Sequence, residues 1–190
     1  MKESKTMMYP PGGLMVWIFI SAEMITFGLF FLAYAYSEQS DPEHFGPSKA
    51  LLNPLVAAIN TVILVTSGFL AALASHAMER GKAKETAWLL VSASFLGIAF
   101  LVIKGWEYVS KYAMDITMST DTFFSFYYFL TLLHFLHVLL GLVILFAVAG
   151  KALKGMYTAE NHMGVKTATA YWHMCDLIWL ILFPLIYLAH

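Results

Sequence analysis

Five long apolar stretches alternate with short polar ones along the chain. They run over residues 14–36, 54–78, 86–114, 122–150 and 166–189. Each is longer than the ~20 residues that a helix needs to cross the ~30 Å hydrocarbon layer of a membrane. Because only helices and closed barrels satisfy the backbone in lipid, continuous runs of this length predict helices. The pattern therefore predicts an all-α integral membrane protein with five transmembrane helices in a bundle.

The polar connections between these runs are short. The segment between the first two runs, "SEQSDPEHFGPSK", contains Pro and Gly, which are helix breakers, and is expected to be a loop. The sequence shows no internal repeat, no low-complexity tract and no soluble segment. Residues 1–190 are therefore predicted to form a single transmembrane domain.

Basic residues are unevenly distributed between the two ends of the predicted helices. Eight of the eleven fall on one side: Lys2, Lys5, Arg80, Lys82, Lys84, Lys151, Lys154 and Lys166. Loops rich in Lys and Arg stay on the cytoplasmic side of a membrane. The bias predicts a cytoplasmic N-terminus (or one in the mitochondrial matrix) and a C-terminus outside.

Composition supports the membrane assignment and excludes other classes. The chain is 60% apolar with a mean hydropathy of +0.72, and 12% of its residues are charged, which argues against a soluble protein. Its net charge of −1 leaves no basic surface for nucleic acid. The single cysteine, Cys175, cannot form a disulfide within the chain.

Five of the ionisable residues inside the apolar runs are expected to form a buried polar seam. Counted at ~1.5 Å per residue, Glu23, His137 and Asp176 all lie about 14–15 Å from the inner edge. His134 is three residues from His137, and His173 is three from Asp176, so each pair shares a helix face. Facing one another would lower the cost of burying these groups in lipid.

A third pair, Lys104 and Glu107, is expected at the outer edge of the third run. The two residues are three apart and can neutralise each other. At that depth a lysine can extend its ammonium toward the membrane surface. We therefore interpret them as a structural pair.

The second run carries a stripe of small and polar residues that is typical of helix packing. It includes Asn60, Thr61, Ser67 and Gly68. Small residues let helix backbones approach closely, and Asn, Ser and Thr can form hydrogen bonds between helices.

Histidine pairs beside carboxylates can also indicate a metal site or a haem held by His137 and His173. No second Glu-x-x-His pattern accompanies them, as it does in di-iron bundles. We therefore predict no catalytic residue, no metal site and no cofactor site in this chain. A proton-coupled transporter that uses Glu23 and Asp176 remains an alternative, because intramembrane carboxylates are functional candidates.

Motifs in all five runs resemble subunit III of the heme–copper oxidases, in the same order along the chain. They are "WIFISAEMITFGLFF", "NTVILVTSGFLAALASHAM", "LGIAFLVIKGWEY", "FFSFYYFLTLLHFLHVLLG" and "HMGVKTATAYWHMCDLIWL". Five spans are similar to the short bacterial members, which lack the first two helices. The resemblance implies a location in the bacterial inner membrane. Glu23 would correspond to the family's buried, carbodiimide-reactive carboxylate.

The resemblance also implies a role. Family members form a helical bundle split by a V-shaped cleft that holds phospholipids, and they carry neither haem nor copper themselves. Such a subunit packs on the catalytic subunit I of a respiratory oxidase, supports proton uptake there and protects the active centre during turnover. Haem and copper are then expected in partner subunits.

This chain departs from the family pattern at several positions. Lys104 stands where the family usually has Gln, and Lys166 and Ala170 stand where many members have Glu and Trp. Relatives of this subunit also accompany quinol oxidases and nitric oxide reductases. The electron donor and the type of complex stay open, because those sites lie on other subunits.

Overall fold

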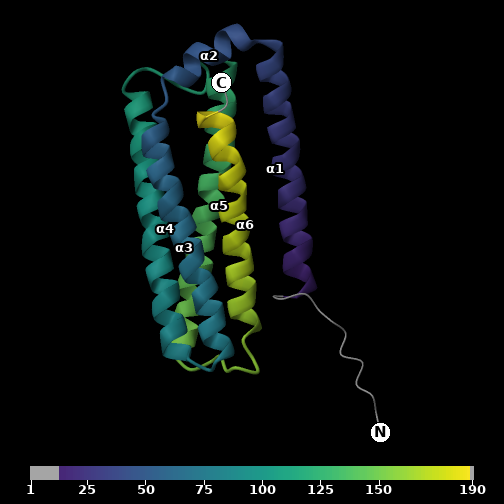
Figure 1. Ribbon diagram of the computed structural model, residues 1–190, viewed down its shortest axis with the longest axis vertical. Helices are drawn as coiled ribbons and strands as arrows, with labels where there is room; N and C mark the ends of the chain where they lie inside the picture. The colour runs from purple at the N-terminus through teal and green to yellow at the C-terminus, as the bar shows by residue number, and fades with distance from the viewer. Residues whose placement is uncertain (1–12, 189–190) are drawn as a thin grey trace.

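The computed structural model describes residues 13–188, and within them the chain forms six helices and no strand. The helices are α1 (Leu14–Ser40), α2 (Pro42–Ala50), α3 (Pro54–Glu79), α4 (Ala83–Tyr112), α5 (Thr122–Leu153) and α6 (Met163–Tyr187). All except α2 are long and apolar enough to cross a membrane. The predicted all-α class with five membrane-spanning helices is confirmed (Figure 1).

The connection between the first two spans differs from its prediction as a loop, because nine of its residues form α2. Pro42 opens this helix, a position at which the missing N–H of proline costs nothing. Glu43 in the first turn and Lys49 in the last turn both suit the helix dipole. Phe45 is buried and meets the ring of Tyr34 edge to face at 5.7 Å. The proline that was expected to break a helix therefore begins one, and α2 caps one end of the bundle (Figure 1).

The five long helices differ in how much of their surface is buried against other helices. α3, α4, α5 and α6 pack closely on one another, whereas α1 stands to one side and contacts α5 and α6 (Figure 1). Of the 27 residues of α1, two are buried, Phe27 and Tyr34. The core therefore lies among the four later helices.

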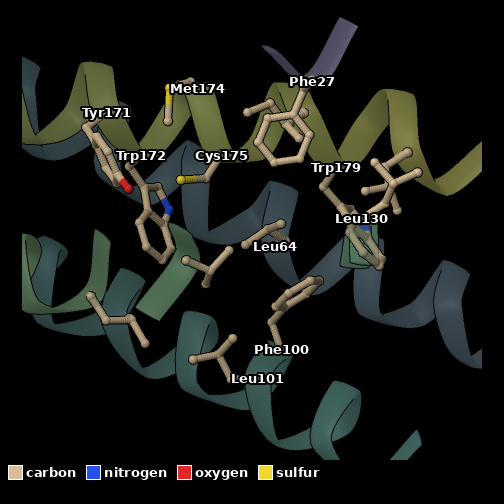
Figure 2. Packing of buried hydrophobic residues seen from close by; sticks show 14 of the residues in the cluster. Phe27, Leu64, Phe100, Leu101, Leu130, Tyr171, Trp172, Met174, Cys175 and Trp179 are labelled. Atoms are coloured by element: carbon tan, nitrogen blue, oxygen red, sulfur yellow. The ribbon is translucent and has the colours of Figure 1, made fainter. Parts of the chain in front are cut away.

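Two tryptophans of α6 fill the centre of that core. Figure 2 shows Trp172 and Trp179 extending from α6 toward α3 and α4, on either side of Leu64. A Cβ added to Gly97 on α4 or to Gly141 on α5 would lie 2.7 Å from the ring of Trp172. These two glycines therefore let α4 and α5 approach the tryptophan closely.

We expect Gly97→Ala to destabilise the chain and Gly105→Ala, on the same helix, to stabilise it. Overpacking against the fixed Trp172 ring costs about 1–3 kcal/mol, whereas Gly105 has no atom within 4 Å of an added Cβ. Replacing an unobstructed helical glycine by alanine gains up to ~1 kcal/mol. Thermal unfolding of the two variants in the same detergent micelles checks this. Equal melting temperatures would contradict the assigned role of Gly97.

A second prediction concerns His44 on the exposed face of α2. Its Nδ1 lies 2.6 Å from Oδ1 of Asp41, and this hydrogen bond, with the attraction between the two charges, raises the pKa of His44. The protonated form is therefore favoured by folding. The resulting stabilisation is complete below the unfolded pKa of ~6.5 and is lost as the pH rises through the folded pKa.

An NMR titration of His44 measures this pKa directly. Asp41→Asn should lower it more than Glu43→Gln does, because the effect of Glu43 is the smaller one and acts through charge alone. Equal shifts in the two variants would show that Asp41 is not its main partner.

Candidate functional site

Two polar residues of α3 lie where that helix contacts α4. Ser67 donates its hydroxyl to the carbonyl oxygen of Ala93 at 2.7 Å, and Asn60 donates its amide to the carbonyl oxygen of Phe100 at 3.2 Å. Both side chains are buried. Each bond joins a side chain of α3 to the backbone of α4, so the two helices are linked at two levels of the membrane.

The same face of α3 also contacts α6. The indole N–H of Trp172 donates to the hydroxyl of Ser67 at 3.1 Å, and that of Trp179 donates to the hydroxyl of Thr61 at 2.9 Å. Gly68 lies against the carboxylate of Asp176, and any side chain at this glycine would overlap it. The structure thus places all four predicted packing residues, Asn60, Thr61, Ser67 and Gly68, at contacts with neighbouring helices.

Glu23 and His137 are brought together across the contact between α1 and α5. Oε2 of Glu23 lies 3.2 Å from Nε2 of His137, while Nδ1 of the histidine lies 2.8 Å from the carbonyl oxygen of Leu133. A carbonyl oxygen can only accept, so Nδ1 carries a proton and donates it. In the neutral ring Nε2 is then an acceptor, and the Glu23 carboxyl must be the donor; in the charged ring Nε2–H donates to a carboxylate. In either form the contact joins α1 to α5.

A second pair joins His173 and Asp176 on α6. Nδ1 of His173 lies 3.3 Å from Oδ2 of Asp176, and the His173 side chain is 45% exposed whereas that of Asp176 is 11% exposed. Oδ1 of Asp176 is buried without a hydrogen bond. No hydrogen bond or ion pair among the described residues joins this pair to Glu23.

His134 lies apart from both pairs. It is fully buried, its ring stacks on Trp179 at a centroid distance of 5.2 Å, and the ring of Phe100 meets it edge-on at 5.8 Å. Neither of its nitrogens has a hydrogen-bond partner in the described chain. The five residues expected to form one seam are therefore found as two pairs and one aromatic-packed histidine.

Lys104 and Glu107 form the centre of a cluster that joins α4, α5 and α6. Nζ of Lys104 donates to Oε2 of Glu107 at 3.1 Å and to the hydroxyls of Tyr127 at 3.2 Å and Tyr187 at 2.5 Å. Both tyrosine hydroxyls donate in turn to Oε1 of Glu107, at 2.8 and 2.7 Å. We call these four residues the lysine–glutamate cluster.

The expectation that Lys104 reaches toward the membrane surface is wrong, because its side chain is 1% exposed. Three oxygen acceptors surround the ammonium, and the rings of Tyr108 and Trp179 lie 5.2 and 5.6 Å from it. Cation–π contact and hydrogen bonds inside the protein replace the hydration that the surface would give. The sequence does contain a signal for this cluster. A Lys–Glu pair in an apolar run leaves donors and acceptors without partners, and tyrosine hydroxyls at the same depth can supply them.

Most of the polar contacts described above join one helix to another. Within residues 13–188, no group of three or more His, Cys, Asp or Glu side chains is placed to hold a metal. Within each pair, and within the lysine–glutamate cluster, the partners lie close enough to lower the cost of burying their charges.

Two kinds of comparison with known proteins agree with each other. A family model described as Cytochrome c oxidase subunit III matches residues 9–189. The chain is 33% identical over 176 residues to cytochrome c oxidase subunit 3 of Arabidopsis thaliana, covering 90% of this chain and 65% of that protein. It is 31% identical over 179 residues to the same subunit of Branchiostoma lanceolatum, covering 90% and 66%. The chain thus spans slightly less than two thirds of the length of these relatives.

The lysine–glutamate cluster yields a stability prediction. Lys104→Met leaves the carboxylate of Glu107 buried without its cation, and breaking a buried ion pair costs about 3–5 kcal/mol. Lys104→Gln keeps a donor and should cost less. Chemical unfolding of the purified chain in micelles, followed by near-ultraviolet circular dichroism, measures both.

Lys154→Met is the matched control, because Lys154 is exposed at the end of α5. It should change the free energy of unfolding by no more than about 0.5 kcal/mol. A Lys104→Met variant as stable as this control would mean that the cluster contributes nothing to the fold.

Proposed function

The chain belongs to the cytochrome c oxidase subunit III family, and from this we propose that it is a non-catalytic accessory subunit of a respiratory heme–copper terminal oxidase. Such a complex reduces O₂ to water and moves protons across the membrane. Haem and copper would be held by partner subunits. The observation that carries this proposal is the family match over residues 9–189, which takes in all five membrane-spanning helices.

We propose further that the chain packs on subunit I, supports proton uptake there and protects the active centre during turnover. The internal contacts support an accessory role. The lysine–glutamate cluster joins three helices, and the hydroxyls of Ser67 and Thr61 each join α3 to a tryptophan of α6. Polar groups that are occupied in this way serve the bundle, so no catalytic residue is proposed in this chain.

A phospholipid is proposed in the hollow between α1, α3 and α6. This hollow has a volume of about 490 Å³, and Trp17, Ile20 and Met24 line its α1 side. Lys166 and Glu79 line it as well and form an ion pair of 3.1 Å. Apolar walls suit acyl chains, and the charged pair suits a zwitterionic headgroup.

The bacterial inner membrane is the proposed location, with the N-terminus cytoplasmic. Support comes from the basic residues of the α3–α4 and α5–α6 connections, which lie at the end of the bundle opposite α2 (Figure 1). Lys2 and Lys5, which contribute to the same bias, lie outside the described residues.

The test is to purify the affinity-tagged full chain from its own membranes in a mild detergent. We expect it to bring with it a haem-containing partner, with a Soret absorption band, and a preparation that consumes O₂. Oxidase prepared without the chain should begin at a similar rate but lose activity sooner during turnover. Membranes from the untagged strain are the control.

Three other results would decide against this role. A preparation that reduces nitric oxide but not O₂ would favour the nitric oxide reductase relatives. Ion flux carried by the isolated chain in liposomes would favour a proton-coupled transporter. A chain that purifies alone, as a stable monomer with no haem partner, would remove the accessory-subunit role altogether.

A further inference from the structure

Lys111, in the last turn of α4, is a buried cation without a carboxylate partner. Its side chain is 6% exposed, and its ammonium donates to the backbone carbonyl oxygen of Leu51. No carboxylate of the described residues forms an ion pair with it. A carbonyl is a neutral acceptor, so the charge of Lys111 is hydrogen-bonded but not neutralised.

The carboxylate one turn earlier on the same helix face is already occupied. Glu107 accepts hydrogen bonds from Lys104, Tyr127 and Tyr187 on its two oxygens. Glu107 is therefore paired with Lys104 and forms no ion pair with Lys111. The buried ammonium of Lys111 has only a neutral acceptor, and burying a charge without a counter-ion is costly.

A pocket of about 640 Å³ opens at this corner, between the start of α3 and the end of α4. Lys111 and Glu107 line its polar end, and Val56, Val102 and Trp106 line its apolar wall. Trp106 and Val102 are 74% and 65% exposed, so the wall continues onto the outer surface of the helices. The pocket thus joins a cation at a helix end to an apolar track that runs into the membrane.

We propose that this pocket binds an anionic membrane lipid, with its phosphate against the Lys111 ammonium and an acyl chain along Trp106 and Val102. The uncompensated ammonium of Lys111 selects an anion, and the apolar wall selects one that carries a hydrocarbon chain. The end of a spanning helix is the depth at which headgroup phosphates lie, and a tryptophan is favoured there. This site is separate from the hollow beside α1, and it stands whether or not the chain joins an oxidase.

Quenching of tryptophan fluorescence by brominated lipid tests the proposal on the full chain reconstituted in vesicles. The vesicles are phosphatidylcholine with a small fraction of dibrominated phosphatidylglycerol or, in parallel, dibrominated phosphatidylcholine. The difference between wild type and Trp106→Phe isolates the signal of Trp106. One lysine near the membrane surface attracts an anionic lipid by about 1 kcal/mol, so we expect about fivefold stronger quenching of Trp106 by the anionic lipid.

Variants of the lysine sharpen the test. Lys111→Met should abolish the preference, Lys111→Arg should keep it, and Lys154→Met, at the other end of the bundle, should leave it unchanged. Helix content measured by circular dichroism shows that each variant has folded.

Equal quenching by the two brominated lipids in wild type would overturn the proposal without reference to any variant. A preference that survives Lys111→Met would equally overturn it. So would loss of the quenching on addition of inorganic phosphate, because the site would then hold the free anion instead of a lipid.

Discussion

Hydrocarbon cannot solvate a polar group, and this constraint decides where the polar side chains of this bundle lie. Ser67 and Asn60 give their protons to backbone carbonyls of α4, and two indole N–H groups of α6 find hydroxyls on α3. Each of these bonds joins two helices. Because apolar contact alone favours one helix neighbour little over another in lipid, such bonds fix which helices meet and at what register.

Charged side chains need partners inside the bundle even more than neutral polar ones do, because burying a charge costs more. Lys104 is buried because two tyrosine hydroxyls and one carboxylate surround it, and the tyrosines come from α5 and α6. Lys166, at the start of α6, pairs with Glu79 at the end of α3 at 3.1 Å. Both lysines therefore have a carboxylate partner within the same chain.

Run length and apolar continuity were enough to predict the five spans, since both follow directly from the thickness of the membrane. Which side of each helix faces which neighbour could not be predicted in the same way. Depth arithmetic put Glu23, His137 and Asp176 in one layer, but Glu23 faces α5 while Asp176 rests against Gly68 of α3. Depth is set by position along one helix, whereas facing depends on how each helix is rotated against its neighbours. For α2, proline was weighed as a breaker, although at the first position of a helix it favours one.

The bond from His137 to the carbonyl of Leu133 has a consequence for the placement of α1. It holds the imidazole so that Nε2 faces α1, where Oε2 of Glu23 lies 3.2 Å away. The ring of Phe27, one of the two buried residues of α1, meets the same imidazole edge-on at 5.5 Å. Two neighbouring side chains of α1 are therefore aligned by one ring of α5. Because so little else of α1 is buried, the rotation of this helix about its own axis is set from α5.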